Sequence, residues 1–198
     1  MTVLGLCLAG FAGSAHAWIF TISSGTREIY LQVGAGTYNG GDFLQGGTPG
    51  ANATINTVSL TVPGASVGNG VAQTMTSNSA VADSSYNDYA VCNPPTQVYI
   101  AAWSRASSNS ATLTVSSPAS LTSGAETIPF TQISWTSTAN GDATADIAAG
   151  TFSGGSVALA TIKKNTWVED CMTFSYQNSG VAAAGTYAGE AVYTLSLP

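Results

Sequence analysis

Residues 185–197, GTYAGEAVYTLSL, carry the clearest structural pattern of the chain. Apolar and polar side chains alternate along this stretch, with a two-residue period that is typical of a β-strand with one buried face. One face of the strand would carry Tyr193, Leu195 and Leu197, and the other would carry Val192 and Thr194. The stretch therefore predicts a half-buried strand that begins near Tyr187.

Similar signals recur upstream and predict an all-β protein. Good helix formers such as Glu, Lys and Arg are scarce, whereas residues that favour strands occur throughout. Further strands are expected where such runs are bounded by turn residues, at 29–33, 55–62, 71–75, 98–103, 111–115, 128–136, 157–162 and 171–176. About eight to ten strands at this spacing are typical of a β-sandwich or barrel. We expect 98–103 and 111–115 to pair as a hairpin.

Charged side chains are unusually few, with 4 Lys and Arg and 10 Asp and Glu in 198 residues, although 44% of residues are hydrophobic and a core is expected. The net charge of -6 argues against nucleic-acid binding, which needs a basic stripe. Edge lysines normally prevent strands from pairing with other chains. Several predicted strands contain no charge at all, which favours association through strand edges; they span 98–103, 111–117, 128–139, 157–162 and 191–198.

The N-terminal residues are typical of an export signal. An apolar run from Val3 to Phe11 precedes Ser14-Ala15-His16-Ala17, where Ala15 and Ala17 fit the small-x-small rule for cleavage. The run is too short to span a bilayer as a helix, and a retained membrane anchor is the alternative. No basic residue precedes the run. We expect residues 1–17 to be removed and a secreted single domain, 18–198, to begin with an extension over 18–25 and to have no membrane span.

Cleavage after Ala17 leaves two cysteines, Cys92 and Cys171. In an oxidising compartment they most simply form a disulfide that closes a long loop. Two buried free thiols or an intermolecular bridge are the alternatives. No metal site is expected, because two distant cysteines without histidine lack the closely spaced ligands of zinc sites. No cofactor is expected either.

Catalysis is not expected. Without His16 the mature chain has no histidine for a Ser-His-Asp or Cys-His arrangement. Carboxylates remain, but none has a motif context and most lie beside turn residues; they are Asp42, Asp83, Asp88, Glu126, Asp142, Asp146, Glu169, Asp170 and Glu190. We expect Glu169-Asp170 to lie in a solvated loop. Residues 140–146 offer oxygen ligands for calcium but lack the glycine position and terminal Glu of an EF-hand loop.

The segment Ala184-Gly185-Thr186-Tyr187, followed after four residues by Val192-Tyr193-Thr194-Leu195, resembles the final strand of bacterial fimbrial subunits, including the spore-coat-U-like pilins. The resemblance implies an immunoglobulin-like β-sandwich that lacks one strand and is completed by a strand donated by the next subunit. It also implies a self-assembling surface fibre or pilus with an adhesive role, and a periplasmic chaperone and outer-membrane usher as partners. In that family the usual disulfide lies in the early part of the domain and closes a short loop. A bond between Cys92 and Cys171 would close a longer loop, later in the chain.

The segment Trp18-Ile19-Phe20-Thr21-Ile22 occupies the position of such a donor strand. Trp18, Phe20 and Ile22 would share one face, and a Ser-Ser-Gly hinge follows. A terminal segment in which every second side chain is apolar, and which is followed by a flexible hinge, can add as a strand to the edge of a sheet. The first strand of the chain's own sandwich is the alternative interpretation.

A secreted carbohydrate-binding module is the alternative function. Such sandwiches stack exposed aromatic rings on sugars, and this chain has candidates in Trp103, Trp135, Trp167, Tyr86 and Tyr89. Large aromatic side chains in strands also commonly belong to the core. The exposure and mutual orientation of these rings therefore discriminate between the two functions.

Overall fold

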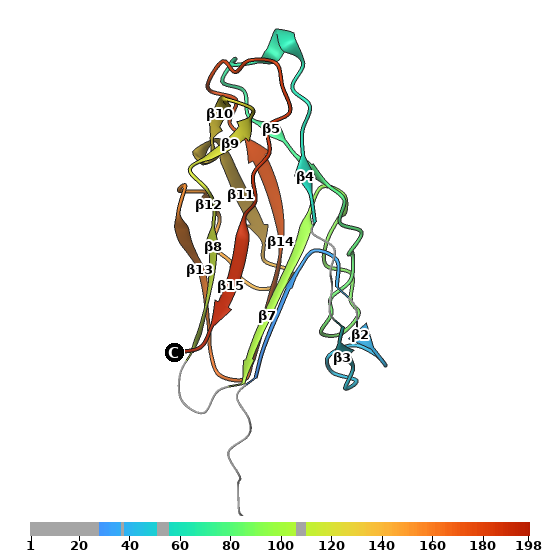
Figure 1. The fold of residues 1–198 in the computed structure, drawn as a ribbon. Coiled ribbons are helices and arrows are strands. Elements are labelled where there is room, and N and C mark those ends of the chain that lie inside the picture. The colour runs from blue at the N-terminus through green and yellow to red at the C-terminus, as the bar shows by residue number, and fades with distance from the viewer. Residues whose placement is uncertain (1–27, 37, 51–55, 106–109) are drawn as a thin grey trace, which may run out of the picture.

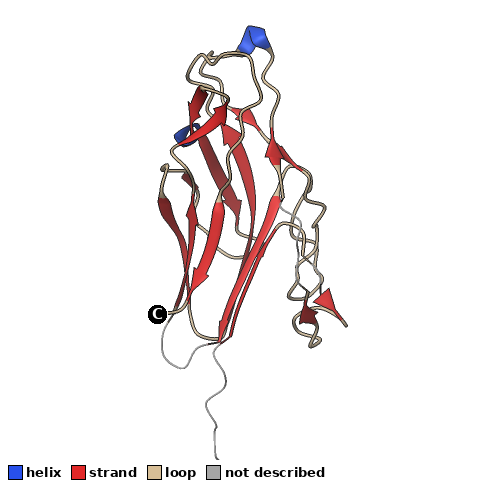
Figure 2. Ribbon diagram, in the orientation of Figure 1, coloured by secondary structure: helices blue, strands red, loops and turns tan. Residues whose placement is uncertain are grey.

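The structure, a computed structural model, describes residues 28–36, 38–50, 56–105 and 110–198. The expected cleavage site and the expected donor segment lie outside these ranges. The described part is all-β, as predicted, with only two short 3₁₀ turns, η1 (Gly64–Ser66) and η2 (Phe130–Gln132). Figure 2 shows that strands and long connecting loops make up almost the whole ribbon.

The larger sheet has six strands, all paired antiparallel. Their order is β1-β7-β14-β11-β12, and β5 pairs with β14 beyond the end of β7. Their bounds are β1 Glu28–Val33, β5 Gln73–Thr74, β7 Val98–Arg105, β11 Ile133–Thr138, β12 Gly150–Thr151 and β14 Thr166–Tyr176. β14 lies at the centre, since one of its edges pairs with β7 and β5 and the other with β11.

The smaller sheet has three strands in the order β13-β8-β15 and faces the larger sheet in Figure 1. These strands are β8 Ala111–Ser116, β13 Ser156–Ile162 and β15 Val192–Ser196. Three two-stranded pairs complete the described fold: β9 (Ser120–Ser123) with β10 (Glu126–Pro129), β2 (Tyr38–Asn39) with β3 (Thr48–Pro49), and β4 (Val58–Ser59) with β6 (Thr76–Ser77).

The hydrophobic core lies between the two main sheets. In β8 the buried residues alternate with half-buried ones, so that Ala111, Leu113 and Val115 point inward. Strands of the larger sheet contribute the facing side chains, and connecting segments close the ends; these include Val98, Ile100, Phe130, Ile133, Trp135, Ile147, Phe152, Val168, Met172 and Phe174. Burial of these apolar side chains is the main stabilising term of such a fold.

β7 is buried on both faces over most of its length. Ile100 and Ala102 belong to the core, whereas Tyr99 and Ala101 point to the outer face and are also fully buried. The outer face is therefore covered as well. Loops from the 34–97 region cover it, because Ser85 N donates to the Tyr99 hydroxyl and Ser85 Oγ to Gln32 Oε1.

The expected hairpin of 98–103 with 111–115 is wrong, although both strands exist. β7 lies in the larger sheet and β8 in the smaller one. Both edges of β7 are occupied by β1 and β14, so no edge remains for β8. The chain therefore crosses from one sheet to the other between these strands.

Other boundaries also differ from expectation. The predicted strand 55–62 is much shorter in the structure, since only Val58–Ser59 form a strand, β4, among its described residues. The predicted strand 128–136 is interrupted by η2, where Phe130 turns into the core and Pro129 ends β10. Among the described residues, nine strands have four residues or more, close to the expected number; they are β1, β7, β8, β9, β10, β11, β13, β14 and β15.

Candidate functional site

β15 is one of the two edge strands of the smaller sheet, opposite β13 (Figure 1). It pairs with β8 in an uninterrupted register, from Val192 opposite Ser116 to Ser196 opposite Thr112. No strand of the described ranges pairs with its other edge. The strand contains no charged residue, although charges are the usual means of blocking an exposed edge.

The main-chain groups of β15 divide between its two edges. The Val192 and Thr194 carbonyls lie on the β8 side, where hydroxyls of β8 approach them at 3.4 and 3.5 Å. In an antiparallel strand the N–H and C=O of one residue point to the same edge, and the edge alternates along the strand. The N–H and C=O groups of Tyr193 and Leu195 therefore face the open edge.

The side chains of β15 have the alternation that the sequence predicts. Leu195 is buried, Tyr193 and Leu197 are half-buried against the core, and Val192 is 50% exposed. Tyr187 does not belong to the strand. Its hydroxyl donates to the Ala183 carbonyl at 2.9 Å in the irregular segment that precedes β15.

That segment leaves the sheet because it packs on the β9–β10 pair. Ala188 forms a bridge with Thr122 of β9. Gly189 lies so close to Phe130 that a Cβ at this position would come within 2.8 Å of the Phe130 ring. This packing excludes the preceding residues from the β8 edge and explains why the strand begins at Val192 rather than near Tyr187.

The other outer strands of the two main sheets, β13, β1 and β12, are protected in other ways. β13 has a register shift between Ala158 and Ala160, and such a bulge disrupts the pairing of an edge. β1 carries the ion pair of Glu28 with Arg105, at 2.7 Å. β12 has only two residues. Among the outer strands of the two main sheets in the described part, β15 alone combines length, regularity and absence of charge. β15 also lies in contact with β1.

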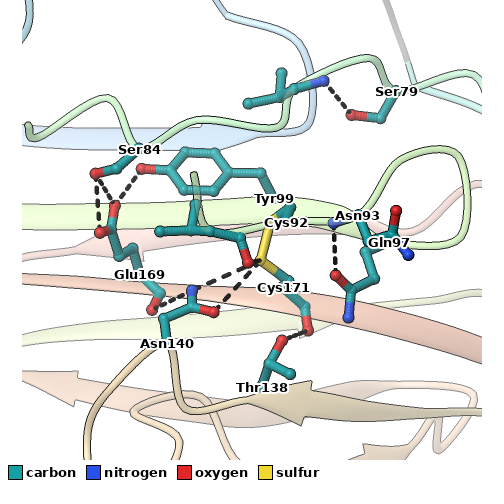
Figure 3. Close-up of a disulfide and its surroundings, with 12 residues drawn as sticks. Ser79, Ser84, Cys92, Asn93, Gln97, Tyr99, Thr138, Asn140, Glu169 and Cys171 are labelled. Carbon is teal, nitrogen blue, oxygen red and sulfur yellow. Dashed lines mark hydrogen bonds between the residues drawn. A yellow bond between two sulfur atoms is a disulfide. The ribbon is translucent and has the colours of Figure 1, made fainter. Parts of the chain in front are cut away.

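Cys92 and Cys171 form a disulfide, with their Cα atoms 5.5 Å apart, which fits the expected pairing (Figure 3). Cys171 lies inside β14 and is fully buried, whereas Cys92 belongs to the outer loops. Thr138 Oγ1 donates to the Cys171 carbonyl at 2.9 Å. The disulfide therefore ties the outer loops to the central strand of the larger sheet.

Glu169 organises a polar network beside the disulfide (Figure 3). Its carboxylate accepts hydrogen bonds from Ser84 Oγ at 2.7 Å, from the Tyr99 hydroxyl at 2.5 Å and from Trp167 Nε1 at 2.9 Å. Burial raises the pKa of Tyr99, and the neighbouring carboxylate acts in the same direction. The Tyr99 phenol therefore stays protonated and holds the loop at Ser84 against β7.

The expectation of a solvated loop at Glu169-Asp170 is wrong. Both residues lie within β14, which begins at Thr166, five residues before the predicted strand. They point to opposite faces, Glu169 to the outer loops and Asp170 inward, where it is 1% exposed. The Ile147 main-chain N–H donates to Asp170 Oδ2, while Oδ1 is buried without a hydrogen-bond partner. Ser84, Tyr99 and Ile147, which bind these carboxylates, are distant along the chain, and no local pattern reveals such partners.

The candidate sugar-binding rings do not form a flat platform. Trp135 lies in the core, and its Nε1 donates to the Ala148 carbonyl at 2.9 Å. Trp103 and Trp167 lie side by side on the outer face, next to Tyr30 in the same cross-strand row. Phe43 and Tyr86 from the loops pack on this row.

The planes of the two loop rings, Phe43 and Tyr86, are inclined to the tryptophan rings on which they pack. Phe43 makes an angle of 62° with Trp103, and Tyr86 one of 33° with Trp167. The rings therefore form a small second core under the loops. Tyr89, which is 72% exposed, stands apart from these ring contacts in the described part.

A hollow of about 260 Å³ lies among the outer loops. Asp42, Asp83 and Asp88 line it, but Asp42 is buried and accepts from Gln45 N at 2.6 Å and from Gln45 Nε2 at 3.0 Å. Within the described ranges, no three His, Cys, Asp or Glu side chains are grouped so that they could hold a metal ion. The loop 140–146 does not bring its two carboxylates into such a group.

The residues expected to form a donor strand, Trp18, Phe20 and Ile22, and those expected at a cleavage site, Ala15 and Ala17, lie outside the described residues. In the part of the chain that is described, no helix has the length and apolar character needed to cross a bilayer. Comparison of the chain with protein-family models, curated proteins and solved structures finds no match.

Proposed function

We propose that this protein is a secreted structural subunit that assembles into a bacterial surface fibre or pilus by accepting a strand from another copy. The open edge of β15, regular in register and free of charge, carries the proposal. The protein would act by assembling with other copies and not by catalysing a reaction. The assembled fibre would be the form that adheres to surfaces. A periplasmic chaperone and an outer-membrane usher would be its partners during export.

The order of the strands supports this proposal. An immunoglobulin-type sandwich has strands A, B, E and D in one sheet and C, F and G in the other. The order β1-β7-β14-β11 matches A-B-E-D, and β8 with β15 matches C and F. Strand G would lie beside β15, at the edge where the described part has no strand. We infer an immunoglobulin-like sandwich that is one strand short.

An added strand would be recognised in two ways. The outward main-chain groups of Tyr193 and Leu195 offer hydrogen bonds that supply affinity without depending on sequence. Alternate side chains of the added strand would pack against half-buried apolar residues of the flanking strands, namely Leu31 and Val33 of β1 and Tyr193 and Leu197 near β15. This packing would set the register.

The donor we infer is the segment Trp18–Ile22. Its apolar face, formed by Trp18, Phe20 and Ile22, matches the need for alternate apolar side chains. It precedes β1 by only a few residues, so each copy would carry its donor next to its own first strand. A chain of copies then follows, because every copy has one donor and one open edge.

The test is a variant in which Trp18, Phe20 and Ile22 are all replaced by Ser. We expect this variant to fold, with the far-UV circular dichroism of the wild type, but to stay monomeric by size-exclusion chromatography and to form no filaments in negative-stain images. The matched control replaces Ile19 with Ser, on the opposite face, and should polymerise. Normal filaments from the triple variant would refute the donor assignment.

A further inference from the structure

Three Asn-Gly pairs lie among the described residues: Asn39-Gly40, Asn69-Gly70 and Asn140-Gly141. An asparagine before glycine is prone to lose its side-chain amide, because glycine has no Cβ to hinder the approach of its main-chain nitrogen to the asparagine side chain. A Cβ added at any of these three glycines would meet no atom within 4 Å. Open space is therefore common to the three pairs, and their hydrogen bonds decide which of them reacts.

The reaction needs two groups to be free at the same time. The main-chain nitrogen of the glycine loses its proton and attacks Cγ of the asparagine. The N–Cγ bond forms and the Cγ–Nδ2 bond breaks, and Nδ2 takes up a proton and leaves as ammonia. Water then opens the resulting succinimide ring at one of its two carbonyls, which gives aspartate or isoaspartate. A hydrogen bond to the side-chain amide or from the glycine N–H opposes the first step.

The pair Asn69-Gly70 is held at both groups. Asn69 Oδ1 accepts from Asn178 Nδ2 at 2.8 Å and from Val71 N at 2.9 Å. Gly70 N donates to the Asn178 carbonyl at 2.9 Å. Asn178 is fully buried and also donates to the Ser66 carbonyl at 2.8 Å. This pair has to open locally before it can react, although the Asn69 side chain is exposed.

The pair Asn140-Gly141 is held less firmly. Asn140 is half-buried, and its Nδ2 lies 3.4 Å from the Glu169 carbonyl and 3.6 Å from Cys171 Sγ. These contacts are long, and weak hydrogen bonds restrain a side chain less than short ones. An intermediate rate is therefore expected at Asn140.

The pair Asn39-Gly40 lies on the outer loops, away from the two main sheets (Figure 1). Asn39 is the last residue of β2 and is exposed, and Gly40 leaves the strand with a φ of +87°. Within the described ranges, neither the Asn39 side chain nor the Gly40 N–H has a hydrogen-bond partner. Both reacting groups of this pair are therefore free.

We propose that Asn39 is a site of spontaneous deamidation, at which Gly40 N displaces the side-chain amide as ammonia and water converts the ring to aspartate or isoaspartate. The chain itself is the substrate, and water is the co-reactant. The order of rates is Asn39, then Asn140, then Asn69. Strand addition at β15 is a separate property, because no residue of β15 belongs to this site.

Isoaspartate at this position changes how the outer loops are held. It adds one carbon to the main chain at the residue that pairs with Thr48 of β3. The preceding Tyr38 packs edge-on against Tyr30 with ring centroids 5.5 Å apart, and Tyr30 stacks on Trp167 at 5.3 Å. Loss of the β2–β3 pairing therefore loosens the packing of Tyr38 on the aromatic cluster.

The test incubates the folded full-length protein at mildly alkaline pH and quantifies the deamidated peptides by liquid chromatography and mass spectrometry. Asn39 should react about tenfold faster than Asn69 or more, because the hydrogen bonds of the Asn69 pair must open first. In the chain unfolded in urea the three rates should become similar, since the local sequence is then the common factor. A folded protein in which Asn39 reacts no faster than Asn69 would overturn the proposal.

Two variants test the cause and the consequence. Asn178→Gly accommodates the φ of +52° at this position but removes the amide that holds Asn69, so deamidation of Asn69 should accelerate while that of Asn39 stays unchanged. An unchanged Asn69 rate in this variant, with its fold checked by thermal unfolding, would show that hydrogen bonds do not control the order.

Asn39→Gln removes the modification, because glutamine must close a larger ring and reacts far more slowly. After incubation, the wild type should unfold at lower urea than Asn39→Gln by tryptophan fluorescence, whereas the two fresh proteins should agree. Equal midpoints after complete deamidation of Asn39 would overturn the link between this residue and the aromatic cluster.

Discussion

Asp170 shows how one buried side chain links stability to pH. Its neighbour Glu169 is hydrogen-bonded by three donors on the outer face, whereas Asp170 is 1% exposed and has one oxygen without a partner. Burial raises its pKa to about 7, and the nearby Asp146 and Asp142 carboxylates act in the same direction, against the Ile147 N–H that favours the charged form. In the folded protein this carboxyl group therefore holds its proton at mildly acidic pH.

The sign of the pH dependence follows from the raised pKa. The unfolded chain releases the Asp170 proton near pH 3.8, whereas the folded chain keeps it up to about 7. The contribution of this group to stability is thus fully present at low pH and is lost as pH rises between these values. We expect Asp170→Asn to show a smaller fall in melting temperature from pH 4 to pH 7 than the wild type, measured by circular dichroism.

The control for this prediction is Asp88→Asn, which changes a carboxylate that lines the hollow among the outer loops. That variant should keep the wild-type dependence on pH. Equal slopes for Asp170→Asn and the wild type would contradict the assignment, because the titrating group would then lie elsewhere.

At the scale of elements, β14 joins the parts of the molecule. Its 11 residues pair with β7, β5 and β11, and its Cys171 is bonded to the outer loops through Cys92. The bond closes a loop with a sequence separation of 79. In the chain-entropy model, cross-linking residues so far apart restricts the unfolded chain strongly.

We expect replacement of both Cys92 and Cys171 by Ala to lower the free energy of unfolding by roughly 4 kcal/mol. Urea denaturation of the purified protein measures this change. The wild type treated with a reductant should lose a similar amount, while the reductant should leave the double variant unaffected. A double variant as stable as the wild type would show that the bond does not stabilise the fold.

At the scale of the whole molecule, two apolar regions share the same strands. The main core packs on one face of β7 and β14, and the aromatic cluster of Tyr30, Phe43 and Trp167 packs on the other. Neither region can lose its packing without exposing the opposite face of these strands. The outer loops and the sandwich are therefore energetically coupled.

We expect the chain to unfold in a single cooperative transition. Far-UV circular dichroism follows the sheets, and tryptophan fluorescence follows the environment of the indole rings, including Trp103 and Trp167 in the outer cluster. The two signals should give the same midpoint in urea. A fluorescence change at clearly lower urea would mean that the outer loops detach independently.

The local patterns of the sequence predicted several elements correctly. Alternation at 111–115 became β8, and alternation at 192–197 placed Leu195 inward and Val192 outward. These predictions succeeded because a two-residue period reports burial of one face of a strand, which is a local property. The all-β class followed from the same residue preferences.

The sequence by itself thus determined an all-β chain with few charges and several strands that contain no charged residue. Only the tertiary structure decided that β7 and β8 lie in different sheets, that Glu169 and Asp170 lie inside β14, and that β15 is an open edge. The physical reason is that sheet partners, such as Ser116 for Val192, are distant along the chain. Open edges and polar networks exist only once those partners meet.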